Sequence, residues 1–295
     1  MGQLFLGIDG GGSKCKARLV DAAGRLLGEG VAGPANAFQN QQQARQSITE
    51  SARRALAAAQ LPDTSLDHIV AGAGLAGVNI PRIACEMEAW QHPFARLYVD
   101  TDIHIACLAA HGGEEGAVIV AGTGSVGYSL LGGVGTTYGA HGFPFGDMGS
   151  GAWLGLEAMQ AVLLALDGLG PDTSLLGRVE AHLGERGLGI IDAMAGAAPR
   201  EYGALAPLVL DCAERGDAVA LGIVETGATY LSDMAQNLLS DGGAALCMLG
   251  GLGEKLIPWM RPELAQRIVP PLGQPDEGAV RFAMQRYLGE TSPAP

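Results

Sequence analysis

The chain has 295 residues, of which 48% are hydrophobic, so it can fill the core of one large or two medium-sized domains. Its formal net charge of −13, with only 18 lysines and arginines, argues against a nucleic-acid groove or an anionic membrane as partner. The 46 glycines have no regular period, and many lie in short clusters beside apolar runs, as ligand sites built from backbone require.

The five cysteines stand far apart and include no Cys-x-x-Cys pair. This spacing predicts reduced thiols and not a disulfide framework, a zinc site or an iron–sulfur site. No apolar stretch is long enough to span a membrane, and Gly7 and Asp9 interrupt the first apolar run, which argues against a signal peptide. We therefore expect a soluble, cytoplasmic protein.

A glycine-rich turn dominates the start of the chain. The segment Gly7-Ile8-Asp9-Gly10-Gly11-Gly12-Ser13-Lys14 lies between an apolar run and the alternating residues 15–20, which predicts strand, turn, strand. Glycines without Cβ atoms can turn several backbone N–H groups toward a phosphate, and Asp9 could hold a hydrated Mg²⁺. Taken alone, the same glycines could equally form a plain hairpin turn.

The spacing in this turn excludes two better-known phosphate-binding motifs. A P-loop ends in Gly-Lys-Ser/Thr, whereas here Ser13 precedes Lys14. A Rossmann fingerprint that starts at Gly10 needs glycine at position 15, which is Cys15. Both motifs also require a helix after the turn, where this sequence predicts a strand.

The next hundred residues alternate between predicted strands and helices. The patterns predict strands over 25–31, 68–72 and 97–100, and helices over 41–60, 81–90 and 103–110. Asn79 is expected to cap the second helix. Asn36 lies in a loop beside Gly33-Pro34, where turn chemistry is the simpler explanation of a lone asparagine. Asp102 follows a strand directly, where an acid can bind a ligand, cap the next helix or do both.

The opening pattern recurs about 115 residues later. An apolar strand over 117–121 enters the turn Gly122-Thr123-Gly124-Ser125, and a second strand over 126–131 follows. A duplicated unit predicts two similar domains that face each other across a cleft, with phosphates held between the two turns. This repetition favours a phosphate site over a plain turn.

The remaining segments supply further small-residue loops. Residues 135–142 are expected to form a loop that carries His141, and Asp147 lies between glycines before a helix over 152–166, as a cap or a ligand. Residues 171–240 are mostly helical, and a buried strand over 244–249 ends in the turn 250–253. A last helix begins near 276, and the tail from 291 is expected to be disordered.

Taken in order, these motifs resemble the actin-like ATPase superfamily, and within it the BadF/BadG/BcrA/BcrD family with its N-acetylglucosamine and glucosamine kinases. The resemblance covers nearly the whole chain. It implies an α/β fold of two ribonuclease-H-like βββαβαβα domains, formed by residues 1–112 with a helix from about 281–295, and by residues 113–280. The motifs that carry it are Asp9–Ser13, Asp102, Gly122–Ser125, Gly146–Gly151 and Gly250–Gly253.

The resemblance also implies a role for each site residue. Asp102 would be the catalytic base, Asp9 would hold Mg²⁺ through water, and Asn36, Asp102, His141 and Asp147 would bind the sugar. The phosphates and the adenosine side of ATP would be bound by Gly10, Gly11, Gly12, Ser13, Lys14, Gly122, Thr123, Gly124, Ser125, Gly250 and Gly251. The expected activity is phosphorylation of the 6-hydroxyl of N-acetylglucosamine or glucosamine by a homodimer.

Two positions depart from the family pattern, and two other functions stay open. Met148 stands where many relatives have glutamate, and His141 stands near a tryptophan of the eukaryotic kinases, so the preferred amino sugar is left undecided. One alternative is an ATPase that activates a radical acyl-CoA dehydratase through an iron–sulfur cluster shared by a dimer. The other is a non-catalytic sugar-sensing regulator, which the presence of both Asp9 and Asp102 disfavours.

Overall fold

The computed structural model describes residues 2–61, 65–240 and 245–291, without the side chain of residue 291. Its contacts divide the chain into two compact units. The first comprises Met1–Gly116, Leu130–Gly133 and Pro271–Pro295, and the second comprises Ala117–Ser129 and Val134–Pro270. The domain boundaries predicted from the sequence, at 112 and 280, stay a proposal, as does the cleft between the domains. No described helix is both long and apolar enough to cross a membrane.

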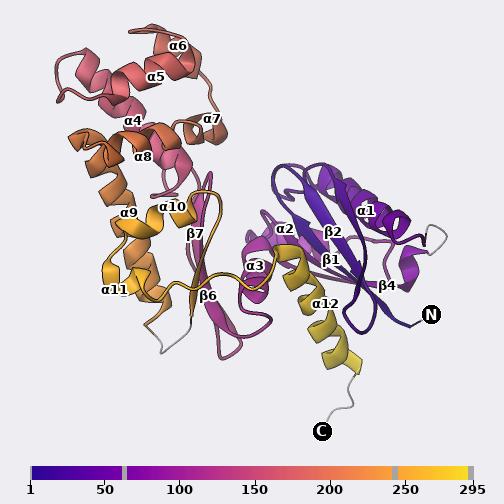
Figure 1. The fold of residues 1–295 in the computed structure, drawn as a ribbon. Coiled ribbons are helices and arrows are strands. Elements are labelled where there is room, and N and C mark those ends of the chain that lie inside the picture. Colours follow the sequence, from indigo (N-terminus) through magenta and orange to yellow (C-terminus); the bar gives the residue numbers. More distant parts are fainter. Residues whose placement is uncertain (1, 62–64, 241–244, 292–295) are drawn as a thin grey trace. The chain divides into compact units, whose positions relative to one another are not determined.

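The first unit is a five-stranded mixed sheet covered by helices on both faces (Figure 1). Its strand order is β3-β2-β1-β4-β5, in which β1 pairs antiparallel with β2 and parallel with β4, and β4 pairs parallel with β5. The elements are β1 (Leu4–Gly10), β2 (Cys15–Val20), β3 (Leu26–Ala32), α1 (Gln41–Ala58), a 3₁₀ turn (Leu66–His68), β4 (Ile69–Leu75), α2 (Pro81–Glu88), β5 (Arg96–Thr101), α3 (Asp102–Ala110) and α12 (Pro275–Thr291).

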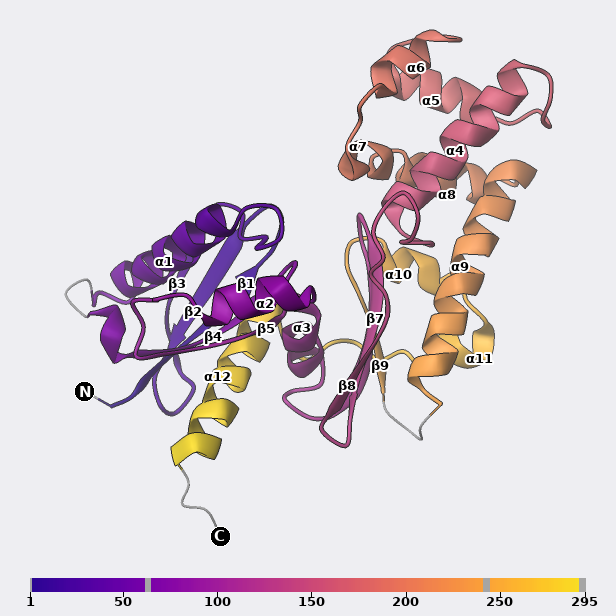
Figure 2. The same ribbon diagram turned by 180° about the vertical axis from the view of Figure 1, so that it is seen from behind.

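Alternation along β1 assigns its side chains to two cores, because successive residues of a strand point to opposite faces. Leu4, Leu6 and Ile8 are buried with residues of α1 and α2. Phe5 is buried on the other face with residues of α3 and α12. Figure 2 shows α1 and α12 on opposite sides of this sheet. Asp9 continues the series of Phe5 and Gly7, and it therefore belongs to the face that α12 covers.

Glycines allow α12 to pack with its backbone against the sheet. A Cβ atom on Gly7 would overlap the carbonyl oxygen of Asp276, and one on Gly278 would overlap the carbonyl oxygen of Ile105 in α3. A Cβ on Gly72 would come within 2.5 Å of the carbonyl oxygen of Ala279. These approaches leave no room for side chains, so the sequence of the first strand and that of the last helix depend on each other.

The second unit has a four-stranded sheet of order β8-β7-β6-β9, in which β6 and β9 are parallel. Most of its core lies on its helices. The elements are β6 (Gly116–Ala121), β7 (Ser125–Leu131), β8 (Val134–Gly139), α4 (Gly151–Leu166), α5 (Leu175–Leu183), α6 (Gly189–Met194), α7 (Pro199–Gly203), α8 (Ala206–Glu214), α9 (Ala218–Leu238), β9 (Leu246–Leu249), α10 (Gly253–Leu256), a 3₁₀ turn (Ile257–Trp259) and α11 (Pro262–Ala265).

The predicted order of elements is confirmed in the first unit, and the described part of the second unit has fewer strands than that order contains. The first unit follows β1β2β3-α1-β4-α2-β5-α3, as the βββαβαβα pattern requires. The described part of the second unit has β9 as its only strand after the opening three. A single parallel bridge between Leu246 and Ile268 stands where a fifth strand would pair.

Three local predictions were wrong, each for an identifiable reason. Residues 134–139 form strand β8, which is almost wholly exposed and therefore shows no alternation of apolar residues. The N-cap of α2 is Ile80 and not Asn79, because the residue before a proline is extended and Pro81 opens the helix. Thr101 caps α3 in place of Asp102, and its hydroxyl accepts the amide of His104 at 3.2 Å. The predicted disordered tail lies outside the described residues after position 291.

Two glycines of α12 provide a matched test of this packing. We expect Gly278→Ala to lower the free energy of unfolding by about 1–3 kcal/mol, because its Cβ would overlap Ile105. Gly289→Ala, on the same helix with nothing within 4 Å of its Cβ, should instead stabilise by up to about 1 kcal/mol, as helix propensity predicts. Urea unfolding of both variants measures the difference. Equal effects would contradict the close packing of α12.

Candidate functional site

The carboxyl ends of the three parallel strands of the first unit lie in one row. Gly10 of β1 pairs with Leu75 of β4, and Leu75 pairs with Thr101 of β5. Asp9 immediately precedes this row and Asp102 immediately follows it. Neighbouring strands are about 4.8 Å apart, so two strand spacings separate the lines of Asp9 and Asp102 by about 10 Å. Both predicted acids therefore lie at one edge of one sheet, where open α/β sheets bind ligands.

Asp9 is a carboxylate in a crowded field of charges. Burial raises its pKa from the ordinary 3.8 to about 6, and the negative charges of Asp102 and Asp276 contribute to the rise. Lys14 and Lys16 act in the opposite direction without cancelling it. A divalent cation near Asp9 would relieve this repulsion, so the residue fits the predicted role at a magnesium site.

Asp102 is the first residue of α3. Burial raises its pKa, against the effect of the backbone amides that lower it, including the N–H of Ile103, which donates to Oδ1 at 2.9 Å. The helix start is held by Thr101 as the N-cap and by Asp100, whose Oδ2 lies 2.8 Å from Nδ1 of His104. These contacts fix the start of α3, and the amide of Ile103 holds one oxygen of the Asp102 carboxyl.

The glycine turn of the first unit is closed by a backbone bond within the turn, and it leaves open space at Gly12. The amide of Gly11 donates to the carbonyl of Lys14 at 3.0 Å. Gly10 is required by packing, since its Cβ would lie 2.6 Å from Leu75. At Gly12 nothing lies within 4 Å of a Cβ, and its φ is not left-handed, so neither packing nor conformation requires glycine there. Space kept open in this way suits a ligand that approaches the backbone closely.

Asn36 belongs to a loop that is hydrogen-bonded to this turn. The amide of Ala35 donates to the carbonyl of Gly11, and the amide of Ala76 donates to the carbonyl of Gly10, both at 2.9 Å. The Oδ1 of Asn36 accepts the amides of residues 38 and 39, each at 3.0 Å. The predicted turn chemistry of Asn36 is therefore confirmed. It fixes the side chain so that its amide nitrogen is the group available to a ligand.

The two glycine turns predicted in the second unit meet at one end of its parallel strands. The carbonyl of Ala121, at the end of β6, accepts the amide of Leu252 at 3.0 Å. Gly250 has a φ of +86°, and a Cβ there would overlap that same carbonyl, so glycine is required. At Gly122, in contrast, a Cβ would meet nothing within 4 Å. The carbonyl of Gly122 accepts the amide of Gly151, which joins the turn to the start of α4.

Asp147 lies directly against the turn Gly122–Ser125. Its Oδ2 would be 2.8 Å from a Cβ on Gly124. Burial raises its pKa, while the amides of Gly142 and Ser125 and the nearby His141 oppose the rise. Asp147 also has a left-handed φ of +61°. His141 is exposed. Asp147 thus braces the turn from within the second unit, and its predicted contact with a sugar stays a prediction.

Met148, where the family resemblance leads one to expect glutamate, has an apolar side chain. It is partly buried against the core of the second unit, and its carbonyl accepts the hydroxyl of Ser125 at 2.8 Å. The side chain that departs from the family pattern therefore packs inward, and its backbone supports the phosphate turn.

Comparison with known proteins decides the family. The model of the BadF/BadG/BcrA/BcrD ATPase family matches residues 6–283. The chain belongs to this family. It is 35% identical to the glucosamine kinase GspK of Vibrio cholerae over 95% of each chain. It is 32% identical to a proposed N-acetylglucosamine kinase from Chromobacterium violaceum, whose crystal structure matches with a TM-score of 0.88 over 96% of this chain and 99% of that one.

A more distant structure bears on the fold alone. The ROK family glucokinase of Streptomyces griseus is 18% identical and matches with a TM-score of 0.53 over 95% of this chain and 98% of that one. The predicted α/β fold of the actin-like ATPases is thereby confirmed for this family member.

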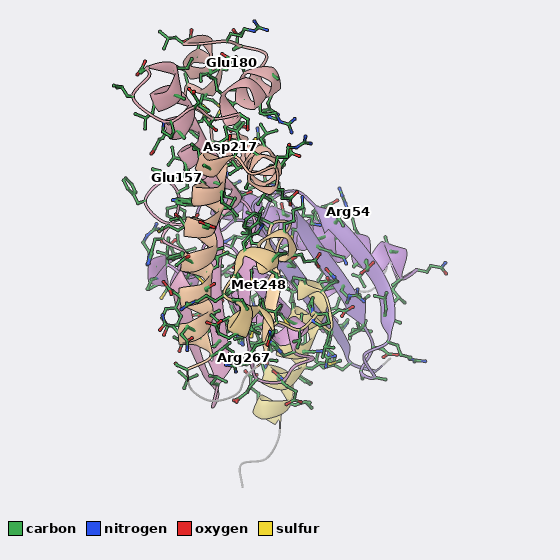
Figure 3. The ribbon with its side chains drawn as sticks, turned by 60° about the vertical axis from the view of Figure 1, so that its left-hand side comes forward. Arg54, Glu157, Glu180, Asp217, Met248 and Arg267 are labelled. Carbon is green, nitrogen blue, oxygen red and sulfur yellow. The ribbon has the colours of Figure 1, made fainter. Side chains whose placement is uncertain are left out.

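Sequence reasoning missed several residues at the first-unit edge. Lys16 stands opposite Asp9 in the β1–β2 ladder, and it contacts Asp276, which lies 260 positions further along the chain. Alternation on β2 could have placed Lys16 beside Asp9, but no sequence signal joins either residue to the last helix. Asp217 (Figure 3) is a carboxylate of the second unit that caps α9 and accepts hydrogen bonds from Thr173 and Ser174.

The described residues include a polar hollow away from the predicted site residues and no ready-made cluster of metal ligands. No group of three or more histidine, cysteine, aspartate or glutamate side chains there could hold a metal ion directly. A hollow of about 950 Å³ over α1, lined by polar side chains such as Gln41 and Arg45, includes none of the predicted site residues.

The raised pKa of Asp9 predicts how its removal affects stability. A carboxyl with a folded-state pKa near 6 and an unfolded value near 3.8 makes the protein less stable as pH rises from 4 to 6. Asp9→Asn should therefore raise the melting temperature above pH 6, and the gain should vanish below about pH 4.

Asp21→Asn is the matched control for this experiment. Hydrogen bonds from Arg25 lower the pKa of Asp21, so its removal should destabilise above its ordinary pKa, and the loss should fade as pH falls. Thermal melts of both variants from about pH 2.5 to 8 measure these opposite trends, since the loss in Asp21→Asn fades only below the ordinary pKa of 3.8. A melting temperature of Asp9→Asn that stays at or below that of the parent at pH 7 would contradict the buried, repelled state of Asp9.

Proposed function

We propose that this protein is an ATP-dependent kinase that transfers the γ-phosphoryl group to the 6-hydroxyl of glucosamine or N-acetylglucosamine. The observation that carries the proposal is the placement of Asp9 and Asp102 at one sheet edge, on the two sides of β4. It is supported by 35% identity with a glucosamine kinase over 95% of the chain. A metal-binding acid and a base at this spacing suit phosphoryl transfer, in which alignment and charge neutralisation dominate.

Asp102 is proposed as the residue that accepts the proton of the attacking hydroxyl. Its pKa is raised by burial, which moves a carboxyl base closer to the operating pH and makes it a better proton acceptor. The amide of Ile103 holds Oδ1, so the other carboxyl oxygen is the one presented to the sugar. No other protein group has to form a bond in this step.

The phosphates of ATP are assigned to the glycine turns. Gly10–Lys14 in the first unit and Gly122–Ser125 in the second would hold them with backbone amides, and Gly250–Gly251 would lie on the adenosine side. The open space at Gly12 and Gly122 supports this assignment. Asp9 would hold Mg²⁺ through water, and the ion would neutralise charge on the β- and γ-phosphates when bound.

The amino sugar is assigned to Asn36, Asp102, His141 and Asp147. Asn36 can donate from its fixed amide, and the carboxylates can accept from hydroxyls, which is the complement that a hexose requires. Met148 supplies no such group, so we expect the chain to rely on Asn36, Asp147 and Asp102 for the hydroxyls of the sugar. A homodimer in the cytoplasm completes the proposal.

The substrate prediction is tested by ADP release with Mg-ATP. We expect release that depends on glucosamine or N-acetylglucosamine and is at least tenfold slower with glucose, since polar groups built for one sugar discriminate by about that factor or more. The controls are N-acetylmuramic acid and a lane without sugar. Equal ADP release in every lane, together with bound iron, would instead identify an activating ATPase, and no release in any lane would favour a sugar sensor.

The base assignment is tested by Asp102→Asn. This variant should lose about 10²–10⁴-fold in kcat while keeping the KM for the sugar within a few-fold, because asparagine keeps an oxygen that can accept a hydrogen bond from the sugar but cannot take its proton. Asp233→Asn, at a side chain 63% exposed and paired with Arg261, is the control and should be unchanged. Initial rates at saturating ATP measure both. Retention of more than a tenth of the parent kcat would refute the role of Asp102.

A further inference from the structure

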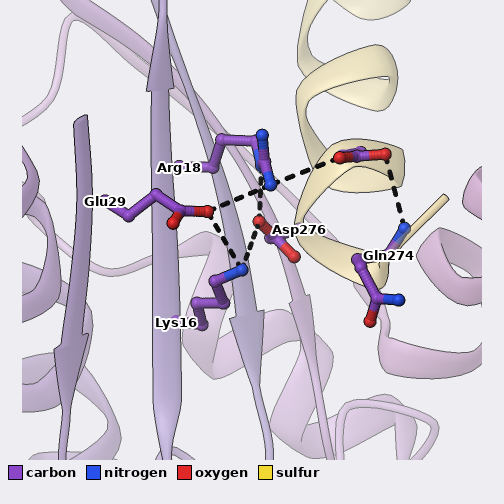
Figure 4. Close-up of polar contacts among 6 residues, drawn as sticks. Lys16, Arg18, Glu29, Gln274 and Asp276 are labelled. Carbon is purple, nitrogen blue, oxygen red and sulfur yellow. Dashed lines mark hydrogen bonds and ion pairs between the residues drawn. The ribbon is translucent and has the colours of Figure 1, made fainter. Parts of the chain in front are cut away.

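The first turn of α12 carries a carboxylate that the proposed reaction does not use. Asp276 is only 1% exposed, and it lies close enough to Asp9 to act on it electrostatically. Its Oδ2 lies 2.6 Å from Nε of Arg18 and 3.1 Å from Nζ of Lys16, both on β2 (Figure 4). Glu29 of β3 contacts the same two cations at 3.0 Å each, and Glu277 reaches Arg18 at 3.2 Å. A buried carboxylate without such partners is costly, and Asp276 has two cations in direct contact.

Lys16 is the member of this network that faces the proposed magnesium site. It is paired with Asp9 in the antiparallel ladder of β1 and β2, and such partners have Cβ atoms about 5 Å apart on the same face. A lysine side chain is long enough to reach Asp9 from this position. Nevertheless, among the ion pairs of the described residues Lys16 joins Glu29 and Asp276, and none joins it to Asp9.

The direction in which Lys16 points determines what Asp9 can bind. An ammonium group in direct contact with Asp9 would occupy the carboxylate oxygens and repel a divalent cation. The two carboxylates of Asp276 and Glu29 draw the ammonium away, and of these two only Asp276 is buried. A buried, oriented partner fixes a flexible side chain far better than an exposed one does.

We propose that Asp276 is a positioning residue that holds Lys16 away from Asp9 and so keeps the Asp9 carboxylate available to magnesium-bound nucleotide. The inference rests on the proposed kinase function. It makes the C-terminal helix part of the site, although no residue of α12 is proposed to contact the substrates. Loss of the Asp276 charge frees Lys16 to pair with Asp9, and magnesium then has to compete with an ammonium group inside the chain.

The test is calorimetric titration of ADP into the full chain, with Mg²⁺ and with EDTA, so that no turnover is needed. In the parent, Mg²⁺ should tighten ADP binding. In Asp276→Asn this gain should fall about tenfold, as is typical for residues that orient a metal ligand, while binding in EDTA is not weakened. Lys16→Met should keep the full gain. The double variant, Lys16→Met with Asp276→Asn, should recover the gain to within about threefold of the parent.

Glu290→Gln separates positioning from simple anchoring of the helix. Glu290 lies near the other end of α12 and accepts the hydroxyl of Tyr98 at 2.8 Å, so it also holds the helix to the sheet. This variant should match the parent in both titrations. The inference is overturned if Asp276→Asn retains the full magnesium gain, if the double variant is no better than Asp276→Asn, or if Glu290→Gln loses as much. A parent that binds ADP equally with and without Mg²⁺ overturns the proposed function as well.

Discussion

The first unit depends on the close approach of the backbone of α12 to the backbones of β1, β4 and α3. Gly7 and Gly72 in the sheet and Gly278 in α12 remove the side chains that would keep these backbones apart. This approach brings a segment from near the end of the sequence over the face that carries Asp9. The charged row Lys16, Arg18 and Asp276 can then form in a place where water is largely excluded, and the electrostatics of the sheet edge follow from that exclusion.

Most of the first unit and its acids could be predicted from the sequence, because their signals are local. Alternation gave the strands, and an acid directly after a strand placed Asp102 at the sheet edge. The glycine turns were found as motifs, but the reason for glycine differs from position to position. At Gly10 and Gly250 a Cβ atom would overlap neighbouring atoms, whereas at Gly12 and Gly122 it would meet nothing within 4 Å. Only coordinates can make that distinction, since it depends on residues far away in the chain.

The features that could not be predicted are of two physical kinds. Strand β8 and the caps of α2 and α3 depend on a choice between neighbouring residues that sequence patterns resolve poorly. The link between Lys16 and Asp276 depends on tertiary packing, and a salt bridge between two ordinary charged residues has no signature of its own. Asp147 is a further case. The sequence shows it as part of the motif 146–151, but only the tertiary structure shows that its carboxylate lies against the turn Gly122–Ser125.

The discontinuous build of the first unit also bears on how the chain is made. Strands β1 to β5 leave the ribosome long before α12, so the face with Phe5, Arg18 and Asp9 is synthesised without its cover. A domain that is completed by a late segment can finish folding only after that segment has been synthesised. Until then its uncovered sheet face can associate with other chains. Because α12 is synthesised after the second unit, the glycines that contact it stay uncovered until then. The proposed magnesium site can therefore assume its final charge arrangement only after the second unit has been synthesised.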